Sequence, residues 1–370
     1  MASNIANTVN FGTTGLNVGD YTYSLYALSA PGYLPLNSYT NSYLVSSYTA
    51  LGALVVPVIT PVSFNVTSQT LPSSQSWRSV AYGNGVFVAI ADGPSTAAAT
   101  SPDGITWTAR TLPSSQPWSA ITFGNGTFVA VAGLGTATTV AATSTDGITW
   151  KARTLPTSAQ WWAVTYGNGL FVTVALSSTS AATSPDGITW TARTLPLSRQ
   201  WRAVAYGNGV FVALSYVNNN SAVSADGITW TTGTTTSGTW IGLAFGNGVF
   251  SAVADGSTVS ATSLDGYTWT ARTITSAGPM AAITYGNNSF LAIGGSGGAT
   301  SPDGVTWTLR TLPPAASTWS SVAFGGGKFV LVDRTPSAVA ATIDYAVNAT
   351  SFVLPNVQTL TGTTAYIKAT

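Results

Sequence analysis

The side chains that could do chemistry are few and of few kinds. The sequence of 370 residues contains no cysteine, no histidine and no glutamate, so its acidic side chains are eleven aspartates. Thiolate and imidazole chemistry, disulfide bonds and the usual zinc sites are therefore excluded. Aspartate carboxylates and arginine guanidinium groups remain as the candidates for catalysis or for anion binding.

Six of the aspartates belong to one recurring motif, Ser-x-Asp-Gly-x-Thr-Trp. They are Asp103, Asp146, Asp186, Asp226, Asp265 and Asp303. The motif predicts a local turn, in which the aspartate accepts backbone N–H bonds, the glycine takes a positive φ and the tryptophan covers the hairpin. Six equal copies cannot all converge on one substrate. We therefore interpret them as structural rather than as catalytic or calcium-binding residues.

The other aspartates are Asp20, Asp92, Asp255, Asp333 and Asp344. Asp92 and Asp333 occupy similar places in the first and last repeats, which should be neighbours, so these two carboxyl groups are expected to approach one another. A glycoside hydrolase that uses two aspartates is the catalytic alternative. Nothing in the sequence marks a carboxyl group with a raised pKa. We therefore predict that the protein is not an enzyme, with no catalytic residue, metal or cofactor.

The elements that must position these residues are repeats of about forty residues. Each repeat begins with a strand, a tight turn such as GNG and a second strand, in which apolar residues alternate. A variable loop, a short third strand, the aspartate turn and a last strand follow. The repeats begin at Trp77, Trp118, Trp161, Trp201, Trp240, Met280 and Trp319. Four strands in each repeat are typical of a β-propeller blade.

Seven repeats begin, but only six end with the aspartate turn. The stretch FNVTSQTLPSSQSW at 64–77 aligns with ITWTARTLPSSQPW at 105–118, which places Gln69 where Arg110 lies. We therefore predict an all-β fold, a seven-bladed β-propeller of four-stranded blades at 62–346, closed by the N-terminal strand 64–70. Closure removes the open sheet edge. Residues 1–61 and 347–370 would form a small domain from both chain ends.

Arginines recur on the last strand of the repeats, at Arg110, Arg153, Arg193, Arg272 and Arg310. We expect them to face the aspartates of the turns as weak surface pairs. Only 6% of the residues are charged and the net charge is +1, so the sequence predicts no nucleic-acid partner. No secretory signal is evident, and the apolar run 50–62 is too short to span a bilayer. We expect a soluble protein without membrane insertion.

Function is expected where the repeats differ. If the first strands line a central channel, the residue after each opening aromatic residue lies at its mouth, and this position varies most clearly at Arg78, Trp162 and Arg202. A flat aromatic ring beside guanidinium groups suits a sugar that carries a carboxylate or phosphate. The alternative is that Trp162 is a second packing aromatic. The predicted ligand-binding residues are Arg78, Trp162, Arg199, Arg202, Tyr216 and Asn219.

The motif of the turns resembles the Asp-box of sialidase-type propellers, although it is one residue shorter. The active site of that family uses an arginine trio, a tyrosine–glutamate pair and an acidic aspartate. A chain without glutamate cannot form that pair in its usual form.

The chain ends resemble the tail-collar and tail-fibre module of bacteriophages. The matching residues are Tyr33, Leu34, Tyr48, Leu51, Phe352, Leu354, Pro355 and Asn356, and the closing YIKAT is similar to the ends of many tail-fibre proteins. The resemblance implies a virion protein, commonly trimeric, that is attached to other tail proteins through 1–61 and 347–370. Its propeller would then bind a host surface glycan. A capsid decoration or tail scaffold protein is the alternative.

Overall fold

The computed structural model describes residues 23–29, 32–35, 59–217, 219–274, 278–295, 297–313, 319–349 and 364–369, with side chains within 63–345. All regular structure in these ranges is β-strand. No helix long and apolar enough to cross a membrane occurs in this described part of the chain. The chain divides into two compact units, Val62–Ala346 and Met1–Pro61 together with Val347–Thr370.

The smaller unit contains a sheet to which both chain ends contribute. Its strands are β1 (Tyr23–Ser29), β2 (Gly32–Pro35) and β29 (Thr364–Ala369), in the order β2-β1-β29. Both pairings are antiparallel, and Tyr26 lies opposite Tyr366. The other residues of the tail-fibre resemblance, Tyr48, Leu51 and Phe352 to Asn356, lie outside the described residues.

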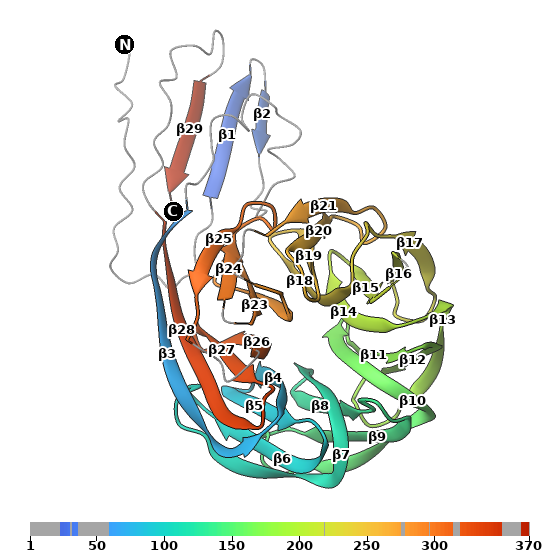
Figure 1. The fold of residues 1–370 in the computed structure, drawn as a ribbon. Helices are drawn as coiled ribbons and strands as arrows, with labels where there is room; N and C mark the ends of the chain where they lie inside the picture. Colours follow the sequence, from blue (N-terminus) through green and yellow to red (C-terminus); the bar gives the residue numbers. More distant parts are fainter. Residues whose placement is uncertain are drawn as a thin grey trace. The chain divides into compact units, whose positions relative to one another are not determined.

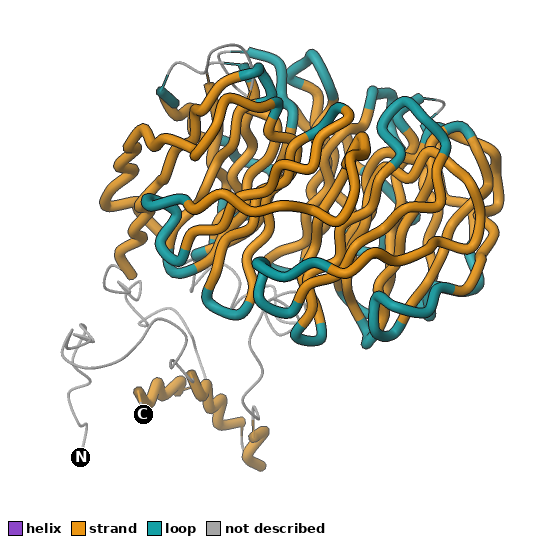
Figure 2. The backbone as a smooth tube through the Cα atoms, turned by 90° about the horizontal axis from the view of Figure 1, so that it is seen from below, coloured by secondary structure: helices purple, strands orange, loops and turns teal. Residues whose placement is uncertain are grey.

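The larger unit consists of antiparallel sheets arranged around a common axis (Figure 1). Three four-stranded sheets follow the order of the chain. They are β14 (Trp201–Gly207), β15 (Val210–Ser215), β16 (Asn220–Ser224) and β17 (Thr231–Thr234); β18 (Trp240–Gly246), β19 (Val249–Ala254), β20 (Val259–Ser263) and β21 (Thr270–Thr273); and β22 (Ala282–Gly286), β23 (Ser289–Gly294), β24 (Gly297–Ser301) and β25 (Thr308–Thr311). The turns lie at the two edges of the sheets (Figure 2).

A fourth four-stranded sheet combines the two ends of the larger unit. It contains β26 (Trp319–Gly325), β27 (Lys328–Asp333), β28 (Ser337–Ala349) and β3 (Ile59–Gln75), in that order. Strand β3 therefore occupies the outer position that the last strand of a repeat takes elsewhere. The Gln69 Nε2 donates to Thr342 Oγ1 at 3.1 Å across this pair of strands.

The first three repeats form one ten-stranded sheet. Its strands are β4 (Trp77–Gly83), β5 (Val86–Ala91), β6 (Pro94–Ser101), β7 (Thr108–Gly124), β8 (Thr127–Ala132), β9 (Thr138–Ser144), β10 (Lys151–Gly167), β11 (Leu170–Leu176), β12 (Ser178–Ser184) and β13 (Thr191–Arg199). Strands β7 and β10 each run from one repeat into the next. The reason is backbone pairing, because Gln116 lies opposite Ser95 and keeps the connection extended.

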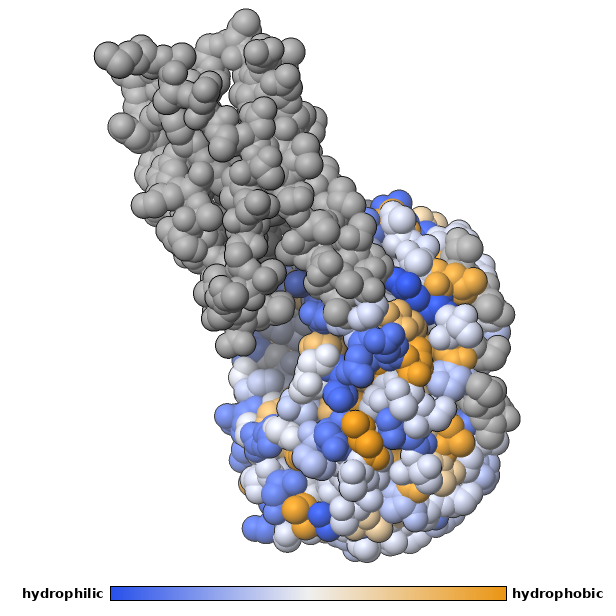
Figure 3. Space-filling model, turned by 90° about the vertical axis from the view of Figure 1, so that its left-hand side faces the viewer, coloured by the Kyte–Doolittle hydropathy of each residue, from blue (hydrophilic) through white to orange (hydrophobic). Residues whose placement is uncertain are grey.

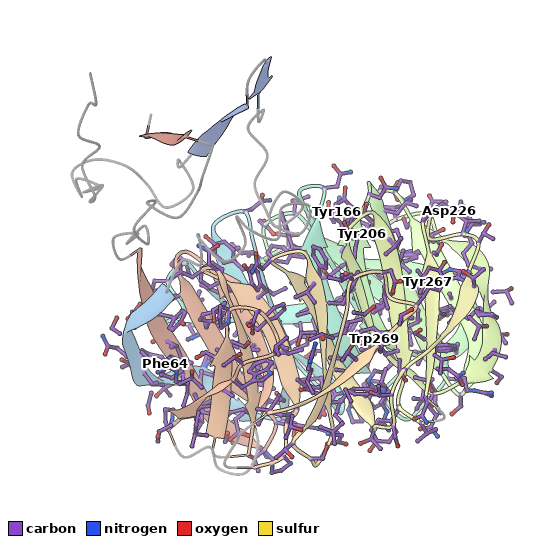
Figure 4. The ribbon with its side chains drawn as sticks, turned by 90° about the horizontal axis from the view of Figure 1, so that it is seen from above. Phe64, Tyr166, Tyr206, Asp226, Tyr267 and Trp269 are labelled. Atoms are coloured by element: carbon purple, nitrogen blue, oxygen red, sulfur yellow. The ribbon has the colours of Figure 1, made fainter. Side chains whose placement is uncertain are left out.

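Aromatic side chains fill the space between neighbouring repeats. Six of the opening tryptophans, among them Trp118, are fully buried. A second aromatic residue on each first strand lies against a glycine of the preceding repeat. A Cβ at Gly124 would lie 2.0 Å from Cγ of Tyr166, and a Cβ at Gly325 would lie 2.0 Å from Cγ of Tyr82. Figure 4 shows Tyr166 and Tyr206 near the same edge of the sheets.

The aspartate turns are held by their own carboxylates. Asp103 Oδ1 accepts hydrogen bonds from the N–H groups of Ile105 (2.8 Å) and Thr106 (2.9 Å) and from the Ser101 hydroxyl (2.9 Å). Gly104 has a φ of 75°, and its carbonyl accepts from the Trp107 indole. The same carboxylate bonds recur in the other five turns. These carboxylates are therefore bound within their own hairpins.

The arginines of the last strands do not face these aspartates as expected. Arg110 Nε donates to Thr100 Oγ1 at 3.0 Å, and Arg153, Arg193, Arg272 and Arg310 make the same bond to a threonine at a diagonal position of the neighbouring strand. One oxygen of each aspartate is already bonded within its own turn. The short cross-strand threonine bond is therefore the contact that the arginine side chain makes.

Candidate functional site: a cationic pocket at the central channel

The residue after an opening tryptophan lies at a β-bulge. The pairing between the first and second strands shifts register between Trp77 and Ser79, which leaves Arg78 unpaired in the ladder. Trp162 and Arg202 occupy the same bulge in their own repeats. A bulge turns a side chain out of the regular alternation of the strand. The side chains of these variable residues therefore do not pack between neighbouring repeats.

The bulged residues surround a cavity at the axis of the larger unit. Its volume is about 450 Å³, and Arg78, Trp162, Arg202, Asp255 and Arg334 are among the residues that line it. This volume falls within the range of roughly 300–1,000 Å³ that small-molecule sites occupy. We call this cavity the central pocket.

Arg202 lies between two aromatic rings in the central pocket. Its guanidinium carbon is 4.6 Å from the centre of the Trp162 ring and 3.6 Å from that of Tyr216. Burial lowers the pKa of Arg202, while the nearby Tyr216 and Asp255 oppose this shift. The buried Nε has no hydrogen-bond partner among the described residues. The stack therefore fixes the plane of a guanidinium group that still has a donor to satisfy.

Tyr216 is held in turn by a carboxylate from the next repeat. Its hydroxyl donates to Asp255 Oδ2 at 2.9 Å. Burial raises the pKa of Tyr216, and the hydrogen bond to Asp255 acts in the same direction. The phenol therefore stays protonated near neutral pH. Asp255, Tyr216, Arg202 and Trp162 form one continuous chain of contacts.

The second arginine, Arg78, also lies over the ring of Trp162. Its guanidinium carbon is 5.1 Å from the centre of the Trp162 ring. Burial lowers the pKa of Arg78 to about 10; the neighbouring Arg334 adds to this shift and Asp92 opposes it. Arg78 is still charged at neutral pH. Because the guanidinium group is already desolvated by burial, an anion that binds it has less desolvation cost to overcome.

The third arginine, Arg334, is paired at the rim of the pocket. Its Nε lies 3.2 Å from Asp92 Oδ2, with the arginine side chain half exposed and the aspartate largely buried. The two residues follow β27 and β5, which are far apart in the sequence. Arg334 therefore adds a third cation to the pocket lining, partly offset by Asp92.

Serines at the same bulge position join repeats and also line the pocket. Ser119 Oγ donates to the carbonyl oxygens of Val131 (2.9 Å) and Trp161 (2.7 Å). Ser320 makes the equivalent bonds to Val332 and Trp77. Arg78, Trp162 and Arg202 differ from these serines because they add charged or aromatic side chains to the pocket lining.

Part of the lining of the central pocket is apolar. Strands β18 and β22, together with the residue before β22, contribute Ile241, Leu243, Ala281, Ala282 and Ile283 to it. A ligand would therefore meet both guanidinium groups with an aromatic face and aliphatic side chains. Sugars, with polar edges and apolar faces, match such a mixed lining.

The structure brings together part of the predicted set. Arg78, Trp162 and Arg202 line the pocket, and Tyr216 stacks on Arg202. Arg199 does not line it, because its Nε donates to Asn220 Oδ1 at 2.7 Å. Asn219 has a positive φ of 51°, and its carbonyl accepts from Thr235 N, so it serves the turn. These two placements differ from the sequence prediction.

Sequence reasoning missed Asp255 and Arg334. Asp333, which was expected to approach Asp92, does not line the pocket. It is fully buried and accepts hydrogen bonds from the Thr335 N–H and Oγ1. Asp92 instead binds the following residue, Arg334. The sequence does show that aspartate recurs at the ends of second strands. That recurrence does not reveal which side chains these aspartates bind.

The described residues contain no cluster of histidine, cysteine, aspartate or glutamate side chains that could hold a metal ion. The side chains that line the central pocket offer guanidinium cations, the Trp162 ring and the Asp255 carboxylate, which accepts the Tyr216 hydroxyl.

The sheets around one axis define the chain as an all-β protein with a β-propeller fold. Virginiamycin B lyase from Staphylococcus aureus has a similar structure, with a TM-score of 0.67 and 12% identity over 76% of this chain and 99% of that one. YCF48 bound to D1 peptide gives 0.58 and 18%, covering 77% and 98%. The WD40 propeller domain of Doa1 gives 0.59 and 12%, covering 76% and 96%. No family model matches the sequence, and no curated protein is similar to it in sequence.

These structures correct the prediction that the protein is not an enzyme. Lyases are among the proteins that share its fold, so a propeller of this kind is compatible with catalysis and the prediction is wrong. At 11–12% identity, the likeness shows the fold alone. One of these lyase structures is of a catalytically inactive variant in which alanine replaces a histidine, whereas the present chain has no histidine. The chemistry of that lyase is therefore not transferred to this pocket.

Proposed function

We propose that the central pocket binds an acidic sugar of a cell-surface glycan. The observation that carries this proposal is the stack in which Arg202 lies between Trp162 and Tyr216, with its buried Nε unsatisfied. A guanidinium group fixed in this way presents a fork that matches a carboxylate, and little conformational freedom is lost when the ligand binds.

The neighbouring groups support the same ligand. Arg78 has been partly withdrawn from water, so its interaction with an anion is stronger than that of an exposed arginine. The face of Trp162 and the aliphatic wall at Ile241 and Ile283 suit the apolar face of a sugar ring. The cavity has room for a terminal residue of a glycan chain rather than for a long segment.

We further propose that the larger unit is a closed ring of seven blades. Three contacts support this: Tyr82 against Gly325, Ser320 Oγ on Trp77 O at 2.7 Å, and Val80 N on Ser321 Oγ at 3.2 Å. They repeat, between the last and first repeats, contacts found between consecutive repeats. A closed ring holds the arginines of distant repeats at fixed positions around one pocket.

The setting that we propose is a bacteriophage tail fibre or other receptor-binding component. This part of the proposal rests on the resemblance of 1–61 and 347–370 to tail modules. Those segments would join the protein to the virion, and several copies, as in a trimer, would raise a weak affinity by roughly 10²–10⁴ through linkage. A capsid decoration or tail scaffold protein is the alternative setting.

The test is binding of the intact chain to host cells and to an array of neutral and acidic glycans. Trp162→Ala combined with Arg202→Ala removes the stack, and Arg110→Ala is the control because Arg110 binds Thr100 outside the pocket. We expect saturable binding to acidic glycans that is lost in the double variant and kept in the control. Each bound glycan is afterwards analysed for cleavage products, which would reveal turnover.

Two results would contradict the proposal. Failure of the folded chain to bind any acidic glycan, even when it is presented as several linked copies, would remove the function itself. Binding that persists in the double variant would move the site away from the central pocket.

A further inference from the structure

The central pocket combines three cations with two anions. Arg78, Arg202 and Arg334 line it together with Asp255, and Asp92 pairs with Arg334 at its rim. The formal charge of this group of side chains is therefore 3 − 2 = +1. None of the described residues that line the pocket adds another charge. The lining itself therefore carries a net charge of +2, and Asp92 at the rim lowers the charge of the whole group to +1.

The two aspartates are held close to the arginines. Asp255 accepts the Tyr216 hydroxyl at 2.9 Å, and the ring of Tyr216 lies 3.6 Å from the guanidinium carbon of Arg202. Asp92 lies 3.2 Å from Arg334 and is largely buried. Burial lowers the pKa of Arg202 and of Arg78, and Asp255 opposes the shift at Arg202 while Asp92 opposes it at Arg78. Each aspartate therefore offsets part of the attraction that a bound anion feels.

We infer that Asp92 and Asp255 make the central pocket select a singly charged carboxylate over a doubly charged phosphate ester. This inference rests on the proposed function, because it concerns the ligand of the same site. A carboxylate carries one charge and can be matched by the fork of Arg202. A phosphate ester carries roughly −1.5 to −2 charges near pH 7. Its charge exceeds the net charge of +1 of these five side chains, and the two aspartates repel its second anionic oxygen.

Asp255 acts at two levels in this arrangement. Its charge repels a second anionic oxygen, and its hydrogen bond holds Tyr216, and thereby Arg202, in place. Asp255→Asn separates the two effects, because the asparagine side chain removes the charge and keeps an oxygen that can accept the Tyr216 hydroxyl. Asp92→Asn removes the other charge and releases Arg334.

The experiment measures affinities of the intact chain by calorimetry or by ligand-detected NMR. The probes are the methyl glycosides of glucose, of glucuronic acid and of glucose phosphorylated at its primary hydroxyl group, which differ only at one carbon. The variants are Asp255→Asn and Asp92→Asn. Asp344→Asn is the matched control, since Asp344 pairs with Lys328 at the surface, away from the pocket lining.

For the unaltered chain we expect the glucuronide to bind best, the phosphate ester more weakly and the neutral glucoside weakest. In Asp255→Asn the ratio of phosphate to carboxylate affinity should rise by about tenfold, as expected when a like charge is removed from a poorly solvated site. Asp92→Asn should shift the ratio in the same direction, and Asp344→Asn should leave it unchanged.

The outcomes separate this inference from the proposed function. Phosphate binding equal to or tighter than carboxylate binding in the unaltered chain, or a ratio that neither pocket variant changes, would overturn the selection by charge and leave acidic-sugar binding intact. Failure of both anionic probes to bind better than the neutral glucoside would overturn the proposed function, and the inference with it.

Discussion

At the scale of single residues, the pocket depends on side chains placed at bulges. Arg78, Trp162 and Arg202 each follow the opening tryptophan of a repeat, and the register shift there turns them toward the axis. Serine at the same position joins two repeats through hydrogen bonds. This position of the repeat therefore lines the pocket, and where it is a serine it also joins two repeats.

These candidates could be found in the sequence because they interrupt a repeat that is otherwise regular. Arg334 and Asp255 could not, because they follow second strands and their partners come from other repeats. Arg199 lies outside the pocket lining for a local reason, since its Nε donates to Asn220 Oδ1. Sequence variation identified the position, whereas the arrangement of the repeats around the pocket determined which side chains meet.

The aspartate turns predict a loss of stability in acid. The Thr106 N–H contributes most to lowering the pKa of Asp103, partial burial opposes it, and the Ile105 N–H and Ser101 hydroxyl add to the lowering. The pKa is lowered in the same direction at Asp146, Asp186, Asp226, Asp265 and Asp303.

A carboxyl group whose folded pKa lies below its unfolded pKa stabilises the fold at pH values above the unfolded pKa. That stability is lost as the pH falls from the unfolded value near 3.8 through the lowered folded value. The melting temperature, measured by circular dichroism, should therefore be steady above about pH 5 and fall steeply below about pH 4. A melting temperature that does not change down to about pH 2 would contradict this account.

At the scale of strands and sheets, the blades are joined by glycine and aromatic pairs. The ring of Tyr166 lies against Gly124, where a Cβ would come within 2.0 Å of its Cγ. Because the glycine sits at the end of the first strand of one repeat and the tyrosine on the next, this contact fixes the spacing between sheets. It also leaves no room for a larger residue.

We predict that Gly124→Ala destabilises the protein by about 1–3 kcal/mol, as overpacking of a filled core does. Gly278→Ala is the control, because an added Cβ there meets nothing within 4 Å; its effect should stay within about 0.5 kcal/mol. Urea unfolding at equilibrium measures both free energies of unfolding. Equal effects of the two substitutions would show that the contact does not limit the spacing of the sheets.

Most of the strands could be predicted from alternation and turn residues, because each repeat states the same pattern again. The continuous strands β7 and β10 could not. Their connecting residues are rich in serine and proline, which is typical of a loop. They nevertheless pair with the preceding third strand, as Gln116 does with Ser95. Backbone pairing over a long distance outweighed the local turn composition here.

At the scale of the whole larger unit, stability depends on how the last repeat meets the first. The outer surface gives little help, since apolar and polar residues are interspersed on the face seen in Figure 3 and the described residues show only two ion pairs. Surface ion pairs stabilise weakly in any case. The contacts between repeats must therefore carry most of the stability.

A pair of matched substitutions tests the proposed closed ring. Ser320 Oγ bonds Trp77 O between the last and first repeats, and Ser119 Oγ bonds Trp161 O between two consecutive repeats. In a closed ring both interfaces break only on global unfolding, so Ser320→Ala and Ser119→Ala should each cost about 1 kcal/mol in urea unfolding. If Ser320→Ala were neutral while Ser119→Ala destabilised the protein, the first and last repeats would separate before the rest unfolds.

The central claim is that the stacked arginine of the pocket recognises an acidic sugar. The most direct measurement is the affinity of the intact chain for the glucuronic acid glycoside, compared between Arg202→Lys and Arg193→Lys. Lysine keeps the charge but loses the planar fork that stacks between Trp162 and Tyr216, whereas Arg193 binds Thr183 outside the pocket. We predict that Arg202→Lys weakens binding by about tenfold or more and that Arg193→Lys leaves it unchanged. Equal affinities in the two variants would contradict the account.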